Sequence, residues 1–318
     1  MRFEATEESR TLTLILAGGK GSRLHPLTVE RPKPAVSFGG IFRIIDFTLS
    51  NCLNSGLRRL GLLTQYKQEE LHRYVREGWG ALWNEFRADR GEFLTCLPPA
   101  SGKRYRGTAD AVLQNIEIIK RERPEFVLIL SGDHIYHMDY RELLQSHTAS
   151  SAGLTIAAID QPIEEAKRFG VLETRADGSV TGFEEKPAHP RAMPGKPGRA
   201  LVSMGVYVFN TAVLLRALQE GAASLERAFD FGKHVIPALI NSIPVCAHTL
   251  PDQTNGTPRY WRDIGTIDSY YEASMDLTQH NPPFDPYSNE DWPTRTIGLA
   301  ACIRAGHPPA FEDACQIP

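Results

Sequence analysis

A glycine-rich stretch followed by basic residues could hold a chain of phosphates. An apolar run at 12–16 leads directly into the sequence Ala-Gly-Gly-Lys-Gly-Ser-Arg, whose glycines are Gly18, Gly19 and Gly21. Because glycine adopts positive φ and has no side chain, successive amide N–H groups can approach one anion. Arg23 and Lys33 follow, and both can add charge-assisted contacts to phosphate oxygens. The stretch therefore predicts a phosphate-binding turn.

Two common phosphate-binding motifs do not fit this stretch. A P-loop ends in Gly-Lys-Ser/Thr, whereas here Gly21 is followed by Ser22 and Arg23. The dinucleotide-binding fingerprint requires a third glycine at the position of Leu24. An ordinary glycine turn with solvated basic side chains is the plain alternative for an isolated Gly-Gly-x-Gly. The stretch is long, however, and each of its unusual residues could contact a phosphate. It therefore favours phosphate binding over an ordinary turn.

A second stretch, at 131–140, carries carboxylates directly after the apolar strand predicted at 126–131. Ligand sites in open parallel sheets form at the carboxyl ends of strands, and Asp133 lies at such an end. A carboxylate there can hold a hard cation such as Mg²⁺, although it could also cap a helix. We interpret His134 and His137 as packing groups or polar neighbours, because magnesium-dependent phosphate chemistry prefers oxygen ligands.

Three further places could supply polar groups, although each has a plain structural explanation. Asp263 lies in a predicted turn and could cap the helix that follows. Glu185 and Lys186, in the sequence Phe-Glu-Glu-Lys-Pro, could be an ordinary solvated charge cluster. Thr108 could cap the helix predicted at 110–120, whose N-terminal dipole favours nearby anionic groups.

The elements predicted around these groups alternate between strand and helix. Apolar runs predict strands at 12–17, 58–64, 126–131, 154–159 and 204–209. Helical periodicity predicts helices at 46–55, 67–77, 110–120, 139–149, 211–219 and 266–277. Continuously apolar strands indicate a mostly parallel sheet that is covered on both faces. The pair Asp177-Gly178 predicts a hairpin and hence a local antiparallel departure. The predicted fold class is α/β with a mostly parallel central sheet.

Composition and charge exclude several other classes of protein. The 318 residues are 42% hydrophobic and 23% charged, with a net charge of −3, as in ordinary globular proteins. This charge argues against a nucleic-acid or membrane-surface partner, either of which would favour a basic face. No apolar run approaches the roughly 20 residues that span a bilayer, and no signal peptide is evident. Widely spaced cysteines without a C-x-x-C pair indicate reduced thiols and a cytoplasmic location.

The motifs together resemble those of the sugar nucleotidylyltransferases, also called sugar-nucleotide pyrophosphorylases. Leu-Ala-Gly-Gly-Lys-Gly-Ser-Arg-Leu followed by Arg-Pro-Lys-Pro-Ala-Val is similar to the family signature, and the other motifs follow in family order through residue 280. The run at 43–51 and the sequence Arg-Asp-Ile-Gly-Thr narrow the resemblance to the ADP-glucose pyrophosphorylase branch. The resemblance implies a Rossmann-like three-layer sandwich. It also implies transfer of AMP from ATP to glucose 1-phosphate, giving ADP-glucose and pyrophosphate for glycogen synthesis.

The resemblance also assigns roles to individual residues. It implies ATP contacts by Gly18, Gly19, Gly21, Arg23, Lys33, Gln65 and Gly107. It implies contacts to glucose 1-phosphate by Tyr105, Gly170, Glu185, Lys186 and Ser203. It pairs Asp133 with Asp263 as ligands of one Mg²⁺ ion, the expected cofactor. The expected catalytic groups among these residues are Arg23, Lys33, Asp133 and Lys186.

The chain is predicted to divide near residue 280. Residues 1–280 would form the nucleotidyltransferase domain. Residues 281–318 are rich in proline and lack clear periodicity, which predicts a linker and an atypical tail. Relatives in this branch usually carry a C-terminal left-handed β-helix and form homotetramers. The tail from 297 shows no hexapeptide repeat, so this β-helix is expected to be absent.

Two alternatives remain open at this level. The same chemistry could use UTP or dTTP, or another sugar 1-phosphate, because loop contacts select the base. Alternatively, the chain could be a non-catalytic regulatory paralogue or an inactive fragment. The presence of Arg23, Lys33, Asp133, Lys186 and Asp263 argues against decay of the site.

Overall fold

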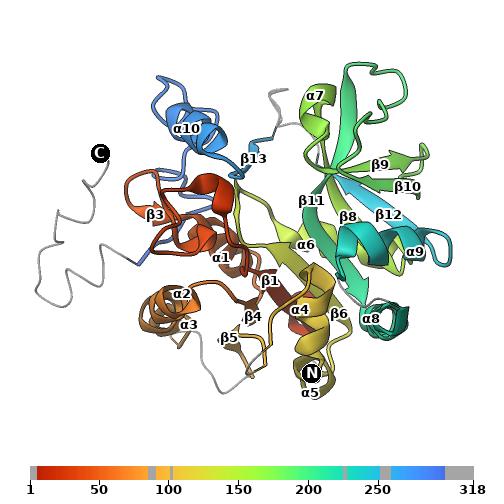
Figure 1. Ribbon diagram of the computed structural model, residues 1–318, viewed down its shortest axis with the longest axis horizontal. Helices are drawn as coiled ribbons and strands as arrows, with labels where there is room; N and C mark the ends of the chain where they lie inside the picture. Colours follow the sequence, from red (N-terminus) through yellow and green to blue (C-terminus); the bar gives the residue numbers. More distant parts are fainter. Residues whose placement is uncertain (1–5, 85–90, 101–102, 225–227, 251–258, 298–318) are drawn as a thin grey trace, which may run out of the picture. The chain divides into compact units, whose positions relative to one another are not determined.

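The computed structural model describes residues 6–84, 91–100, 103–224, 228–250 and 259–297 (Figure 1). The chain forms two compact units. Unit 1 comprises Met1–Leu16, Pro99–Ser131 and Tyr140–Arg259, and unit 2 comprises Ala17–Pro98, Gly132–Asp139 and Tyr260–Pro318. Within the described ranges, no helix has both the length and the apolar character needed to cross a membrane.

A sheet forms the centre of unit 1. Its buried middle is the parallel pair of β1 (Thr11–Leu16) and β6 (Phe126–Ser131). Both strands are buried along almost their whole length, as expected for apolar strands that are covered on both faces. The other strands are β8 (Leu154–Pro162), β9 (Gly170–Thr174), β10 (Val180–Glu185), β11 (Arg199–Asn210) and β12 (Val245–Thr249).

The long strand β11 runs antiparallel to β6, β8 and β9. Its register against β8 shifts between Ser203 and Tyr207, and Gly205 between them has a φ of +68°. An irregularity of this kind bends a strand and re-aims its side chains. β9 and β10 form the antiparallel hairpin that was predicted from Asp177-Gly178, so this prediction is confirmed.

Helices flank the sheet of unit 1. They are α4 (Thr108–Gln114), α5 (Ile116–Glu122), α6 (Tyr140–Ser150), α7 (Ile163–Ala166), α8 (Thr211–Ser224) and α9 (Ile236–Ile240), with short turns η1 (Glu8–Arg10) and η6 (Phe231–Val235). The prediction of one continuous helix over 110–120 is wrong. Asn115 separates α4 from α5, and its amide donates to Ala111 O at 2.9 Å and to Tyr105 Oη at 2.8 Å. An asparagine that bonds the preceding turn in this way competes with the helical hydrogen bonds.

The central helix of unit 2 is α1 (Ile44–Asn54), which is buried along nearly its whole length. The helix begins after Arg43, whose backbone N–H donates to Asp46 Oδ2 at 2.8 Å. The same buried carboxylate accepts from Tyr74 Oη at 2.7 Å and from Trp79 Nε1 at 2.8 Å. Burial raises the pKa of Asp46, and these donors offset part of the rise. The carboxylate thus ties α1 to the two neighbouring helical segments that carry the donors.

The other elements of unit 2 are short. The strands are the parallel pair β4 (Arg59–Leu63) and β5 (Phe93–Leu97), and the antiparallel pairs β2 (Ser37–Phe38) with β3 (Phe42–Arg43) and β7 (His134–Tyr136) with β13 (Trp261–Asp263). The helical elements are η2 (Ser22–Leu24), η3 (Lys33–Ala35), α2 (Gln68–Tyr74), η4 (Val75–Trp79), α3 (Gly80–Asn84) and α10 (Ile267–Asp276). The helix predicted at 67–77 is therefore interrupted by the π-turn η4, whereas the one predicted at 266–277 is confirmed as α10.

An aromatic core beside α1 includes a residue from the proline-rich segment. Its buried members are Leu24, Val36, Phe38, Phe42, Ile44, Phe47, Ile135, Ile264, Ala273 and Phe284. The described residues 281–297 contain no helix or strand, but their Phe284 is a buried member of this core. The domain boundary near residue 280 stays a prediction.

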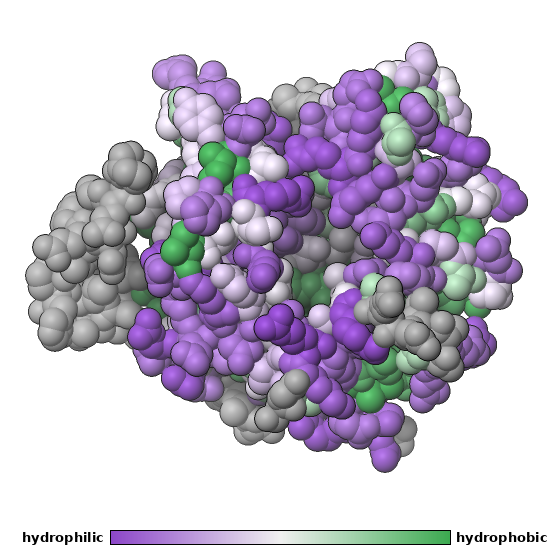
Figure 2. All heavy atoms as spheres, in the orientation of Figure 1, coloured by the Kyte–Doolittle hydropathy of each residue, from purple (hydrophilic) through white to green (hydrophobic). Residues whose placement is uncertain are grey.

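Exposed apolar side chains are few on the described surface. The large ones are Val29, Ile41, Ile267, Tyr271, Met275 and Tyr287. On the face drawn in Figure 2, the green areas are small and separated by purple. This face therefore has the polar character expected from the composition.

The predicted α/β class, with a mostly parallel central sheet and flanking helices, is confirmed. The parallel pairs are β1 with β6, β4 with β5, and β8 with β12. The described antiparallel pairs of unit 1 all involve β9 or β11.

Candidate active site

The glycine-rich stretch follows β1 in the chain. It packs against Gln65 and Lys33, two of the other residues that are expected to contact ATP. A Cβ on Gly18 would lie 3.3 Å from the Cβ of Gln65. Gly21 has a φ of +61°, and a Cβ there would lie 2.9 Å from the Cβ of Lys33. Both its conformation and the space available therefore require glycine at position 21. A Cβ on Gly19 would meet no atom within 4 Å, so the backbone there is open to a ligand.

Lys33 is buried between two carboxylates. Its Nζ lies 2.8 Å from Asp133 Oδ2 and 3.0 Å from Asp263 Oδ1, and only 8% of its side chain is exposed. Burial lowers the pKa of Lys33, but the attraction of the Asp133 and Asp263 carboxylates outweighs burial, so the pKa is raised overall. The ammonium group is therefore a charged internal counter-ion for this pair.

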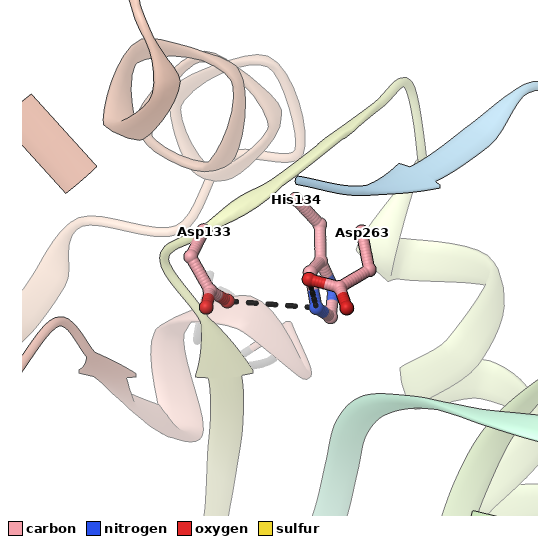
Figure 3. A group of neighbouring side chains, drawn as sticks. All are labelled: Asp133, His134 and Asp263. Atoms are coloured by element: carbon pink, nitrogen blue, oxygen red, sulfur yellow. Dashed lines mark ion pairs between the residues drawn. The ribbon is translucent and has the colours of Figure 1, made fainter. Parts of the chain in front are cut away.

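Asp133 and Asp263 converge because β7 pairs with β13. His134 begins β7 and lies opposite Asp263, which ends β13, and Asp133 immediately precedes β7. Figure 3 shows the three side chains pointing toward one another. The turn predicted at Asp263 is wrong, because this strand ladder extends through it. The cap of α10 is Thr266, whose hydroxyl accepts from Ser269 N–H at 3.2 Å.

These three side chains suit a divalent cation. Asp133, His134 and Asp263 each offer a ligand atom, and these atoms lie within 4.8 Å of one another. His134 Nε2 is 3.5 Å from Asp133 Oδ1 and 3.8 Å from Asp263 Oδ1. Its ring packs edge-on against Trp261 at 5.1 Å. Its buried Nδ1 has no hydrogen-bond partner among the described residues. Carboxylate oxygens are the ligands that hard cations prefer, so the residues present fit such an ion. We call Lys33, Asp133, His134 and Asp263 the acidic centre.

Arg23 lies beside the acidic centre. Its side chain is exposed, and Nη2 lies 3.5 Å from the position that a Cβ on Gly265 would take. The same Cβ would lie 2.9 Å from Asp263 Oδ2, so glycine at this position leaves room for both groups. Unit 2 therefore holds the predicted residues Gly18, Gly19, Gly21, Arg23, Lys33, Gln65, Asp133 and Asp263.

Tyr105 and Gly107 lie on a segment of unit 1 that precedes α4 and is held by hydrogen bonds with Asn115 and Asp110. Asn115 Nδ2 donates to Tyr105 Oη at 2.8 Å, and burial raises the pKa of Tyr105 to about 12. The carboxylate of Asp110, on α4, is buried and accepts from Arg106 N–H at 2.8 Å. A Cβ on Gly107 would overlap a backbone carbonyl of unit 1, so only glycine fits there.

The predicted capping role of Thr108 is wrong. Gly107 holds the N-cap position of α4 and has no side chain that could cap it. Thr108 is the first helical residue instead, and its hydroxyl accepts from Phe231 N–H at 3.0 Å. Asp230 Oδ1 accepts from Thr108 N–H at 3.0 Å. These bonds fasten the start of α4 to the segment that leads into η6.

Glu185 and Gly170 lie opposite each other on β10 and β9. A Cβ on Gly170 would overlap the Phe183 ring, and a Cβ on Gly232 would lie 2.5 Å from Glu185 Oε2. Lys186 follows with a φ of +53°, a conformation that is uncommon and costly for a residue with a side chain. Its Nζ lies 3.2 Å from Glu185 Oε1, and 59% of its side chain is exposed.

Ser203 is buried on β11 next to Tyr207. Its Oγ donates to Tyr207 Oη at 3.3 Å and accepts from Gly205 N–H at 3.1 Å. Burial raises the pKa of Tyr207 to about 12, and the negative charge of Glu185 adds to the rise. We call Gly170, Glu185, Lys186, Ser203 and Tyr207 the Lys186 group, all of it in unit 1.

Two residues of these sites, Tyr207 and His134, were not among the predicted site residues. Tyr207 lies in the strand predicted at 204–209 and alternates with Gly205, but Ser203 lies outside that range, so only the observed strand β11 shows that Ser203 and Tyr207 share a strand. His134 was interpreted as a packing group or a polar neighbour, and not as a residue that could offer a ligand atom. Its place beside Asp133 becomes informative only once the pairing of β7 with β13 is known.

The chain is similar to known proteins over most of its length. The family model described as Nucleotidyl transferase matches residues 12–280. A protein of Paramagnetospirillum magneticum named glucose-1-phosphate adenylyltransferase is 49% identical over 295 residues, which are 90% of this chain and 68% of that protein. A protein of the same name from Shewanella frigidimarina is 50% identical over 300 residues, 93% of this chain and 70% of that protein. Nucleotidyl transferases generally use a divalent metal, in keeping with the acidic centre. The chain therefore belongs to the nucleotidyl transferase family.

Proposed function

We propose that this chain transfers AMP from ATP to glucose 1-phosphate, giving ADP-glucose and pyrophosphate. The observation that carries the proposal is the acidic centre, where a buried lysine meets two convergent carboxylates beside a glycine turn. Relatives named glucose-1-phosphate adenylyltransferase, at 49% and 50% identity, support these substrates. The activated glucose would serve glycogen synthesis.

The reaction needs charge neutralisation more than proton transfer. A phosphate oxygen of glucose 1-phosphate attacks the α-phosphorus of ATP, and the bond from that phosphorus to the β-phosphate oxygen breaks. Pyrophosphate leaves with the bonding electron pair. The attacking oxygen is already anionic at neutral pH, so no general base is required. Catalysis therefore depends on positioning the two phosphates and neutralising their charge.

We assign the triphosphate to the glycine turn and its basic neighbours. The amides of Gly18, Gly19 and Gly21 would bind phosphate oxygens, with Gln65 and Gly107 toward the nucleoside. Lys33 has three N–H donors, of which two point to Asp133 and Asp263, so the third can serve a phosphate oxygen. Arg23 is exposed and would neutralise the departing pyrophosphate.

We assign one Mg²⁺ ion to Asp133 and Asp263. A magnesium ion held there would supply charge neutralisation of the phosphate oxygens. The two carboxylates come from separate strands and leave other coordination positions for phosphate and water. His134 Nε2 lies within 3.8 Å of both carboxylates and would help to fix their orientation.

We assign the sugar phosphate to unit 1. Lys186, with 59% of its side chain exposed, would neutralise the phosphate of glucose 1-phosphate. Glu185 would accept hydrogen bonds from sugar hydroxyls. Gly170 would allow close approach of the backbone, and Ser203 and Tyr105 would supply hydroxyl groups. ATP as a substrate favours a cytoplasmic location.

Product analysis with several nucleotides tests the proposal. Purified protein is incubated with Mg²⁺, glucose 1-phosphate and, in separate reactions, ATP, UTP or dTTP, and the sugar nucleotides are identified by mass spectrometry. We expect ADP-glucose as the main product. UDP-glucose or dTDP-glucose as the main product would favour the alternative substrates. No sugar nucleotide from any mixture, with a folded protein, would favour a non-catalytic paralogue.

A further inference from the structure

A buried amide links the proline-rich segment to the strand beside the acidic pair. Asn51, on α1, is fully buried. Its Nδ2 donates to Tyr136 O at 3.0 Å, and its Oδ1 accepts from Met138 N–H at 3.3 Å. Trp292 Nε1 donates to the same oxygen at 2.8 Å. One side chain therefore joins α1, the end of β7 and the described residues 284–296, which we call the brace.

The brace reaches the same strands at a second point. Phe284 packs in one core cluster with Ile135 of β7 and Ile264, which follows β13. Its ring centroid lies 4.4 Å from that of His137. It also stacks on Tyr260, which precedes β13, at 4.8 Å with an interplanar angle of 15°. The brace therefore contacts residues of both strands or beside them through Phe284, and it reaches the end of β7 also through the hydrogen bond from Trp292 to Asn51.

β7 and β13 need such support because both are short. Each has three residues, and their ladder consists of three residue pairs. A two-stranded antiparallel pair of this size is at best marginally stable in water. Asp133 precedes β7 and Asp263 ends β13, so any tilt or slip of one strand moves one carboxylate against the other. The separation of the two carboxylates therefore depends on packing around the strands.

We infer that Asn51 and Trp292 are positioning residues for the acidic centre. The brace holds Asp133 and Asp263 at the separation that a metal ion requires, and it acts through β7. The inference rests on the proposed function, because it takes this pair as the metal site. Partners that orient metal ligands directly change metal affinity about 10- to 100-fold when removed. The brace acts through β7, so we expect a smaller change in metal affinity.

Trp292→Phe is the variant that tests this role. It keeps an aromatic ring in the brace and deletes the N–H donor to Asn51. Tyr287→Phe is the matched control, because it deletes another hydrogen bond of the brace, to Gly39 O at 2.7 Å, and leaves Asn51 untouched. Asn51→Ser is a stronger variant, since a serine hydroxyl is too short to reach the Tyr136 carbonyl. Circular dichroism and thermal melting establish that each variant is folded.

Two measurements report the position of the strands. Hydrogen exchange followed by mass spectrometry monitors the β7 amides without any ligand, and paramagnetic resonance monitors binding of Mn²⁺ alone. We expect Trp292→Phe to speed β7 exchange about 5-fold, the effect of one net hydrogen bond. We expect it to weaken Mn²⁺ binding about 3- to 10-fold, less than a direct partner would. Turnover should need more Mg²⁺ but recover at saturation.

The outcomes separate this inference from the proposed function. Parent-like exchange and Mn²⁺ binding in Trp292→Phe overturn the inference. Equal effects in Tyr287→Phe also overturn it, since they would reflect a general loss of stability. If Asp133→Asn leaves Mn²⁺ binding unchanged, the metal assignment itself fails and the inference falls with it. If Asp133→Asn weakens Mn²⁺ binding and Trp292→Phe does not, the positioning role alone is overturned.

Discussion

The acidic centre and the Lys186 group each place a lysine beside carboxylate, yet they hold it in different ways. Lys33 is 8% exposed, and its Nζ lies within 3.0 Å of Asp133 and Asp263. Lys186 is 59% exposed, and its ion pair with Glu185 spans 3.2 Å. The charge of Lys33 is largely neutralised inside the protein before any ligand arrives. The charge of Lys186 faces solvent and stays available to an anion.

This difference predicts different effects for substitutions in the acidic centre and at Lys186. Removing one partner of a buried ion pair leaves a charge without compensation, which is strongly destabilising. Removing an exposed lysine costs the fold little, because solvent already screens it. Changes in the acidic centre should therefore affect stability and turnover together. Changes at Lys186 should affect the affinity for one substrate.

Lys33→Met should have the largest effect. It leaves Asp133 and Asp263 facing each other without their counter-ion, so we expect a loss of about 3 to 5 kcal/mol in unfolding free energy. A divalent cation can take over the neutralisation, so Mg²⁺ or Mn²⁺ should raise the Tm of the variant more than that of the parent. Thermal melting with and without metal measures both effects. An unchanged Tm would mean that the buried ion pairs do not stabilise the fold.

Asp133→Asn should have the second largest effect, which we expect in the turnover number kcat. It keeps the shape of the side chain and removes the charge that would hold a metal ion. We expect kcat to fall about 100- to 1,000-fold, as when a major electrostatic stabiliser of a transition state is lost. Pyrophosphate release at saturating Mg²⁺ measures it, with Asp177→Asn, at an exposed turn of unit 1, as control. Near-parental turnover in Asp133→Asn would remove this residue from the catalytic groups.

Lys186→Ala should change affinity for the sugar phosphate. One charge-assisted contact is worth about 1.5 to 3 kcal/mol, so KM for glucose 1-phosphate should rise about 10- to 100-fold. A contact made equally in the ground and transition states leaves kcat nearly unchanged. Initial rates at varied glucose 1-phosphate measure this, with Lys186→Arg as the variant that keeps the charge. A rise in the KM for ATP alone would place Lys186 at the other substrate.

The smallest expected effect concerns His137 in unit 2. Burial lowers its pKa to about 4, although Asp285 pulls the other way. The unfolded chain therefore takes up a proton near pH 6.5 that the folded chain does not, and stability falls as the pH drops from 6.5 toward 4. Between pH 6.5 and 5.5 the loss should be about 1 kcal/mol. Chemical denaturation of the parent and of His137→Gln measures it. The same pH dependence in both proteins would contradict this origin.

Sequence periodicity was a good guide where elements were long or had a distinctive turn. The β9–β10 hairpin followed from Asp177-Gly178, and α10 and β6 followed from their apolar patterns. The resemblance paired Asp133 with Asp263 and assigned Lys33 to ATP, and the structure brings the three side chains into contact. Their individual roles stay predictions.

Contacts that depend on long-range packing could not be predicted. β7 and β13 have three residues each, too few to show a period of two. The brace contains no helix or strand, so it shows no periodicity. Its hydrogen bonds join single side chains to separate parts of unit 2, such as Trp292 to Asn51 and Tyr287 to Gly39 O. Trp292 therefore looked like a residue of a linker. The break at Asn115 was hidden for a similar reason, since a side-chain bond to Ala111 O overrides the helical pattern there.

The most direct test of the division between the two regions is one set of initial rates over a grid of ATP and glucose 1-phosphate concentrations. It is measured for the parent, Asp133→Asn and Lys186→Ala at saturating Mg²⁺. The division predicts that Asp133→Asn lowers kcat and keeps the KM for glucose 1-phosphate within about 3-fold, whereas Lys186→Ala raises that KM and keeps kcat within about 3-fold. If both variants change the same parameter for the same substrate, the acidic centre and the Lys186 group do not have the separate roles that we assign to them.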